Sequence, residues 1–353
     1  MHGRAAALAI LATAAAAQAS SLTNEVIANA TQATDANPQS GTFTNALNAS
    51  FDLGEAWTLN AGLALTLESQ TAAASRFGQG GSVVTLLTAG ADWSPTENFT
   101  LGTSFVISPR STQFAATQVT IDTTNGDQQT GDALVRSQIS QLGVGADVSW
   151  DSLGISDLEW SLDLAVDYSH YAVDQSVSEI RVGTRTETAD TLLADCQAHP
   201  RRCNQSLLTV LRNVPVQQDF ERISASVTAI LFRDTDLTLD ASGFLYQQDP
   251  AGVSYFGLAA AGRAPEVPIA PLRYLVRPEV QHRFGDFSAR VWVEAGEYVS
   301  GTGQGTTGIG TRLQYRFSKA WRAWVRLSGR RDVDEAGNAT RSGTISAGVG
   351  YRW

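Results

Sequence analysis

Long apolar runs, lysine and the usual catalytic motifs are all scarce or missing in this chain of 353 residues. After residue 19 no stretch is long and apolar enough for a membrane helix, which needs about 20 such residues. Lys319 is the only lysine, so arginine carries nearly all of the positive charge. The formal net charge is −10 at pH 7, and an acidic chain of this kind argues against nucleic acid as a partner. The sequence thus predicts a protein without a helical membrane anchor and without a nucleic-acid partner.

The first 19 residues, MHGRAAALAILATAAAAQA, have the features of a secretory signal peptide. Arg4 supplies a positive start, Ala5 to Ala17 an apolar segment, and Ala17-Gln18-Ala19 an A-x-A cleavage site. We therefore expect residues 1–19 to be removed on export and residues 20–353 to form one domain.

From residue 43 onward, short segments alternate between apolar and polar residues, as in strands with one apolar face. They come in pairs joined by short turns, such as Gly54-Glu55 and Gly285-Asp286. Each segment has about the 9 to 11 residues with which a tilted strand crosses a bilayer. The long connections all fall on the side opposite the short turns: 68–82, 108–135, 169–220, 247–272, 299–307 and 331–341. This asymmetry predicts an all-β fold, a transmembrane antiparallel up-and-down β-barrel.

The number of strands follows from the direction of the last one. Thirteen strands can be identified from residue 43 onward. The last of them runs toward the side of the short turns, so a barrel with an even number of strands needs one more strand before residue 43. Only Leu22 to Gln32 is available, where Val26, Ala28 and Ala30 alternate weakly. We therefore predict about 14 strands, with 12 or 16 as the alternatives.

The last thirteen residues, RSGTISAGVGYRW, alternate strictly and end on an aromatic residue. In this they resemble the C-terminal strand of bacterial outer-membrane β-barrel proteins, porin-like proteins of Gram-negative bacteria, without indicating a subfamily. The resemblance implies an outer-membrane location, with lipid around the strands, short periplasmic turns and long extracellular loops. It also implies that the barrel assembly machinery reads an assembly signal made of Ile345, Val349, Tyr351 and Trp353. It indicates no particular oligomeric state.

The connection 169–220 differs from the others. Within residues 188–213, five leucines recur at near-helical spacing, which predicts a short helical hairpin. Cys196 and Cys203 lie in this segment, and an exported protein meets an oxidising compartment, so we expect a local disulfide. Zinc held by these cysteines and His199 is the alternative, but it lacks a clear fourth ligand. The loop is either a constriction of the pore or a stapled surface excursion, and the excursion is the simpler interpretation.

Alternation also assigns the inner face of the barrel, because a charge facing the middle of the bilayer costs about 2–4 kcal/mol. The carboxylates predicted to line the pore are Asp147, Glu159, Asp163, Asp167 and Asp240. The arginines predicted to line it are Arg290, Arg312, Arg316, Arg322, Arg326, Arg330 and Arg352. One half of the wall is thus acidic and the other half basic.

Two functions fit such walls. If they stay apart across water, the barrel is a porin-like channel for passive diffusion of small polar or charged solutes. If the side chains meet and fill the lumen, the barrel is a structural or adhesive surface protein. A channel for hydrophobic substrates is a further alternative. Since 16 to 18 strands enclose an aqueous channel and about 8 do not, a barrel of 14 strands favours the polar channel.

Catalysis is not expected. Outside the signal peptide the chain has three histidines, His170, His199 and His282, and none shares a level of the barrel with another. No GxSxG, HExxH or Gly-rich phosphate loop occurs. Asp163 and Asp167 could act as an acid and base, but a solvated ladder of wall carboxylates is the simpler interpretation. We predict no enzymatic activity, no cofactor and no metal.

Overall fold

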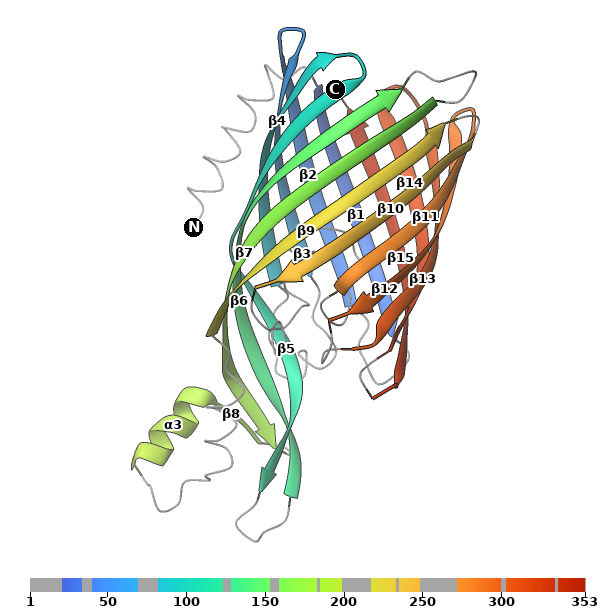
Figure 1. Cartoon of the computed structure of the whole chain (residues 1–353). Coiled ribbons are helices and arrows are strands. Elements are labelled where there is room, and N and C mark those ends of the chain that lie inside the picture. The colour runs from blue at the N-terminus through green and yellow to red at the C-terminus, as the bar shows by residue number, and fades with distance from the viewer. Residues whose placement is uncertain are drawn as a thin grey trace.

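The computed structural model describes residues 21–33, 40–68, 82–122, 128–152, 159–182, 185–198, 217–232, 235–247, 272–299, 303–333 and 336–352. Fourteen antiparallel strands form a closed barrel, and a fifteenth, β8, is a short addition at its edge (Figure 1). In the first half of the chain the strands are β1 (Ser21–Ala33), β2 (Ser40–Leu53), β3 (Trp57–Glu68), β4 (Ser82–Thr96), β5 (Phe99–Asp122), β6 (Gln128–Ser152), β7 (Glu159–Val182) and β8 (Arg185–Thr188). After helix α3 (Ala189–Ala198) come β9 (Gln217–Phe232), β10 (Thr235–Tyr246), β11 (Leu272–Phe284), β12 (Phe287–Tyr298), β13 (Gly305–Arg316), β14 (Trp321–Val333) and β15 (Ala339–Arg352).

The barrel closes where the two ends of the chain meet. β1 pairs with β2 on one side and with β15 on the other, from Thr23 opposite Arg352 to Ala33 opposite Ser342. The weakly alternating segment Leu22 to Gln32 is therefore a full strand of the barrel. The prediction of an all-β, 14-stranded transmembrane barrel is confirmed. None of the helices in the described ranges has the length and apolarity needed to span a membrane.

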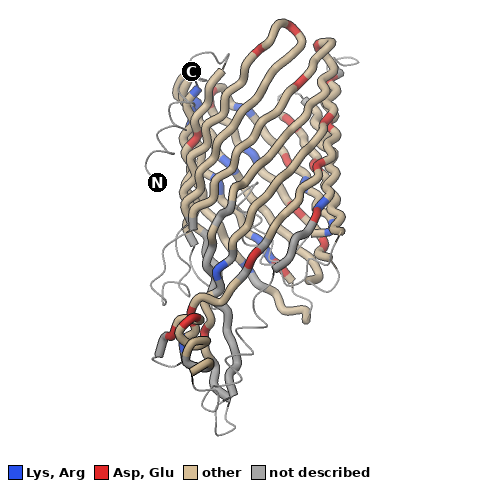
Figure 2. The backbone as a smooth tube through the Cα atoms, turned by 90° about the vertical axis from the view of Figure 1, so that its left-hand side faces the viewer, with Lys and Arg blue, Asp and Glu red and all other residues tan. Residues whose placement is uncertain are grey.

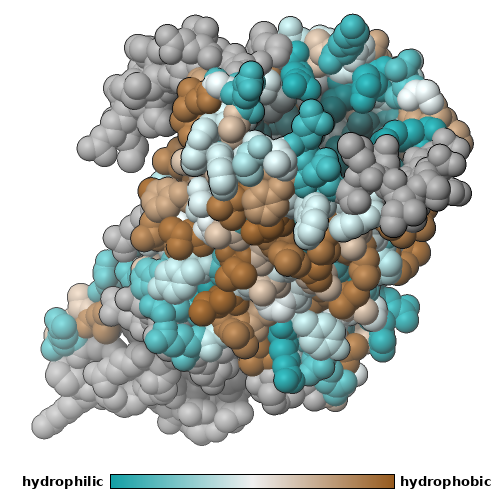
Figure 3. Space-filling model, turned by 45° about the horizontal axis from the view of Figure 1, so that its top comes forward, coloured by the Kyte–Doolittle hydropathy of each residue, from teal (hydrophilic) through white to brown (hydrophobic). Residues whose placement is uncertain are grey.

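The outside of the barrel is apolar because every second residue of each strand faces outward. Large hydrophobic side chains are exposed on nearly every strand, among them Leu65, Phe105, Val166, Val291 and Leu327. On the face that Figure 3 shows, hydrophobic residues form a brown band across the barrel, with hydrophilic residues above and below it. Such a band is the surface that lipid covers.

A belt of aromatic rings marks one edge of this band, next to the short turns. The rings lie in cross-strand or neighbouring pairs: Trp57–Trp93, Trp150–Trp160, Phe284–Phe287, Tyr315–Phe317 and Trp321–Tyr351. Aromatic residues prefer the interface between lipid and water. The belt therefore places the periplasmic interface at the short turns, where Gly54 and Gly285 supply positive φ angles of 76° and 62°.

Three strands are far longer than the sequence predicts. β5, β6 and β7 have 24, 25 and 24 residues and continue well beyond the barrel on the extracellular side (Figure 1). The prediction of a long loop over 108–135 is wrong, because nearly all of that range forms the β5–β6 hairpin. Within 169–220, β7 likewise continues to Val182 and is followed by β8 and α3. α3 lies in the first part of the helical hairpin expected over 188–213, and residues 199–213 lie outside the described residues, so the hairpin remains a prediction.

Candidate functional site

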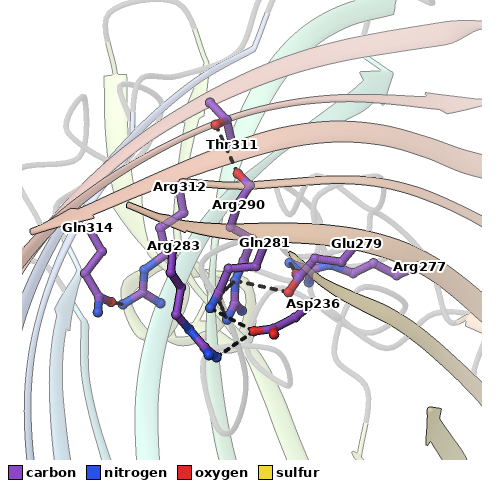
Figure 4. Close-up of polar contacts among 9 residues, drawn as sticks. All are labelled: Asp236, Arg277, Glu279, Gln281, Arg283, Arg290, Thr311, Arg312 and Gln314. Atoms are coloured by element: carbon purple, nitrogen blue, oxygen red, sulfur yellow. Dashed lines mark hydrogen bonds and ion pairs between the residues drawn. The ribbon is translucent and has the colours of Figure 1, made fainter. Parts of the chain in front are cut away.

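The inner wall of the barrel is built from the residues that alternate with the apolar outer ones. On β11 to β14 one row of paired positions runs through Gln281, Arg290, Arg312 and Arg326. Three arginines thus lie directly opposite one another on consecutive strands. Like charges in paired positions destabilise a sheet unless other groups compensate them. The side chains around this row provide that compensation in two ways, and Figure 4 shows the polar contacts of the first.

The first is ion pairing around Arg290, at the end of the row nearest β10. Arg290 donates from Nε and Nη2 to Gln281 Oε1 at 3.0 and 2.6 Å, and its Nε also lies 3.0 Å from Glu279 Oε1. Arg277 Nη2 lies 3.6 Å from the other oxygen of Glu279, so this buried carboxylate joins two arginines. Beside them, Arg283 forms a 2.5 Å ion pair with Asp236 (Figure 4).

The second is stacking on tryptophan. The guanidinium groups of Arg277 and Arg326 lie 4.6 and 4.5 Å from the centre of the Trp292 ring. Trp292 is only 2% exposed and lies across Gly310, its paired residue on β13. A Cβ atom at position 310 would lie 2.1 Å from Trp292 Cζ2, so only glycine leaves room for the ring. Cation–π contacts of this kind hold a charge in place without a carboxylate.

Trp324 repeats the arrangement one strand pair further along. Its ring lies across the paired Gly348, where a Cβ would be 2.5 Å from Trp324 Cε2. Arg312 stacks on this ring at 4.4 Å. The indole Nε1 donates to Glu25 Oε1 at 2.7 Å, which ties β14 to β1 across the closing strand. The weak first strand therefore contributes a carboxylate to the basic wall.

Nearer the extracellular end, charges on the wall are fully buried. Arg330 donates from Nη2 to Glu294 Oε1 at 2.8 Å, and their side chains are 9% and 4% exposed. Tyr298 donates to Asp332 Oδ1 at 2.5 Å beside them. Apolar and aromatic side chains pack at the same level: Leu272, Tyr298, Phe244 and Leu275.

The opposite wall carries carboxylates of a different kind. Asp147 lies across its paired Gly102, and Asp167 lies across Gly145. With Asp163 they follow the inner face of β6 and β7, and none of the three forms an ion pair with another described residue. Asp240 accepts a hydrogen bond from Thr228 at 2.7 Å. Figure 2 shows acidic residues, in red, distributed along the barrel strands.

The remaining predicted residues divide by position. Arg316, Arg322 and Arg352 lie near the short turns and are exposed, with Arg322 3.8 Å from Glu25. Glu159 begins β7, but its side chain is outside the described part of the structure. All the predicted arginines and the four aspartates thus share the phase of the inner wall.

The outer face of β15 carries the predicted assembly signal. Ile345 and Val349 are exposed there and Tyr351 packs against Trp321 at 4.6 Å, whereas Trp353 lies outside the described residues. The role of these four residues in barrel assembly remains a prediction.

The histidines are dispersed. His170 on β7 lies 3.9 Å from Glu221, and His282 on β11 contacts Thr235 at 2.8 Å near a short turn. In the described ranges no cluster of three or more His, Cys, Asp or Glu side chains could hold a metal. The zinc alternative concerns Cys196, His199 and Cys203, of which only the backbone of Cys196 is described.

The disulfide is testable separately from the barrel, and it remains a prediction because Cys203 lies outside the described residues. Cys196 lies near the end of α3, beyond the barrel wall. Reduction should therefore leave the barrel folded and make the segment after α3 more sensitive to protease, since so short a loop gains only about 2–3 kcal/mol from its closure. A thiol assay on the unreduced protein gives the control: two free thiols would contradict the pairing.

Sequence reasoning missed Glu25 and Asp236 as members of the basic wall. Alternation contains the signal for Asp236, because Asp236 has the same phase as Asp240. It could not reveal that Trp292 and Trp324 lie flat over glycines, because that depends on the pairing register.

No family model matches the sequence, and no curated protein matches it. Solved structures do match the fold. A FadL homologue from Pseudomonas aeruginosa has a TM-score of 0.50 at 10% identity, over 94% of this chain and 89% of that one. The toluene transporter TbuX from Ralstonia pickettii has a TM-score of 0.48 at 9% identity, over 94% and 88%. The translocator domain of the autotransporter NalP from Neisseria meningitidis has a TM-score of 0.42 at 12% identity, over 99% and 96%.

The closed barrel, its apolar band and the likeness to the FadL homologue agree on the fold class. The chain has the fold of a bacterial outer-membrane β-barrel protein, and the outer membrane is its location. At these identities the likeness extends to the fold and not to a substrate.

Proposed function

We propose that this barrel is an outer-membrane channel through which small polar or charged solutes diffuse passively. The observation that carries the proposal is the contrast between the two walls. Asp147, Asp163 and Asp167 form no ion pair with a described residue, while the basic wall holds more arginines than carboxylates. A filled, purely structural lumen would be expected to pair its charges, because an unpaired buried charge is costly.

Ion selectivity tests this proposal. Neutralising Arg316 and Arg322, the exposed arginines at paired positions on β13 and β14, should shift selectivity toward cations. Asp163→Asn should shift it toward anions, because charges in a wet lumen act on permeation more than on folding. The measurement is the reversal potential of the protein in a planar bilayer under a salt gradient.

A matched control removes a charge elsewhere. Arg331→Gln changes the same charge on the outward, exposed face of β14 and should leave the reversal potential unchanged. If wild-type protein folds but gives no conductance, the structural or adhesive alternative replaces the channel.

A channel for hydrophobic substrates is the second candidate. The apolar cluster of Leu272, Tyr298, Phe244 and Leu275 on the extracellular part of the inner wall favours it. Such a channel would take up an apolar dye while passing little ionic current, whereas the polar channel would do the reverse.

A further inference from the structure

We infer that the basic wall contains a binding site for an oxyanion, a carboxylate or phosphate group of a solute, centred on Arg312 and its paired neighbours Arg290 and Arg326. The inference rests on the proposed channel in one respect, since the lumen must admit the solute. It names the solute class that the channel would favour.

The charge count of this part of the wall is the first support. Arg277, Arg290, Arg312, Arg322 and Arg326 lie together on β11 to β14. Glu279 contacts Arg277 and Arg290, Glu25 contacts Arg322, and Asp240 is paired with Arg277 across β10 and β11. Five positive charges and three negative ones leave a net charge of +2 among these described residues. A concentrated positive potential on a protein wall attracts anions.

The way the central arginine is held is the second support. Arg312 is fixed by the face of Trp324, and an aromatic face occupies none of the guanidinium N–H groups in the way a carboxylate would. Its Nη2 has one weak partner, Gln314 Oε1 at 3.3 Å, and its Nε has no hydrogen-bond partner. The Nε of Arg277 also has no hydrogen-bond partner. Stacking therefore orients a planar set of donors and leaves part of it unused.

Geometry decides which anion fits. A guanidinium presents its N–H groups as a planar fork, which matches the two oxygens of a carboxylate or phosphate and gives no such advantage to chloride. Arg312 presents this fork between two further arginines in paired positions, Arg290 and Arg326, and Arg290 already binds Gln281 and Glu279. The wall thus has the donors, the charge and the fixed orientation that an oxyanion site requires.

Titration calorimetry of the folded barrel in detergent tests the site, with benzoate and inorganic phosphate as separate probes and neutral benzamide as the control ligand. Benzoate or phosphate should bind and benzamide should not. Arg312→Gln should weaken binding about tenfold, the effect of losing a charge-assisted hydrogen bond pair. Arg312→Lys keeps the charge and should restore only part of the affinity, because it lacks the fork. Arg331→Gln should bind as the wild type does.

The outcomes separate the site from the channel. Binding of neither oxyanion, equal binding of benzamide, or equal affinity in Arg312→Gln and wild type would each overturn the site. Because the ligand comparison uses the wild-type protein, it decides even if Arg312→Gln fails to fold. Oxyanion binding without ionic conductance would support the site and refute the channel. Conductance without oxyanion binding would keep the channel and overturn the site.

Discussion

Replacing Gly310 by alanine should destabilise the barrel by about 2–3 kcal/mol, the usual cost of adding a methyl group where there is no room. The new Cβ would lie 2.1 Å from Trp292 Cζ2 and 2.4 Å from Cε2. The ring cannot easily retreat, because the guanidinium groups of Arg277 and Arg326 cover it. The loss should appear as a lower urea midpoint of the refolded protein in lipid vesicles.

Two variants complete this test. Gly243→Ala adds the same methyl group on β10, where a Cβ would meet no atom within 4 Å, and should leave the midpoint nearly unchanged. Trp292→Leu combined with Gly310→Ala should be less destabilised than the sum of the two single changes. Equal midpoints for Gly310→Ala and Gly243→Ala would show that the ring does not occupy this position.

Arg330→Gln should destabilise the barrel more, by about 3–5 kcal/mol, because it leaves the Glu294 carboxylate buried without its positive partner. The two side chains are 9% and 4% exposed, so water cannot replace the lost contact. Glu294 lies across its paired Gly308, where a side chain would collide with the carboxylate. The measurement is again the urea midpoint, with heat-modifiable migration as the check of folding.

The neighbouring arginine provides the control for this variant. Arg331→Gln removes the same charge from the exposed, outward face of β14 and should change stability by less than about 0.5 kcal/mol. Removing both charges with Glu294→Gln and Arg330→Gln should recover most of the loss, because no buried charge then remains. An Arg330→Gln protein as stable as Arg331→Gln would show that the pair is hydrated.

The barrel could be predicted from sequence because lipid imposes a simple rule on every second residue. The alternation around Leu164 and Val166 predicts which side of β7 faces outward, and both residues are exposed there. The same rule places Arg290, Arg312 and Arg326 on the inner wall. It needs only the residue types along one strand at a time.

Features that depend on pairing between strands could not be predicted from the sequence. The contact of Glu25 with Trp324 joins residues 299 positions apart, through a first strand whose alternation is weak. The lengths of β5 and β6 were missed because, outside the membrane, strand pairing no longer requires apolar residues at alternate positions. The segment 108–135 is polar enough to resemble a loop, yet Thr112 pairs with Gln138 and Ile121 with Gln129 in a continuous hairpin.

The tryptophans that lie across glycines affect which register neighbouring strands adopt when the barrel assembles. The outward residues of β14 and β15 are apolar, so a slip of two residues would leave the lipid-facing surface much as before. The inner face distinguishes the alternatives. A slip in one direction would put Ser346 in place of Gly348 beneath the Trp324 ring, and a slip in the other would bring Arg352 opposite Arg322. Lipid selects the face of each strand, and the fit of ring over glycine, together with the separation of Arg322 from Arg352, selects which of the permitted alignments becomes the native one.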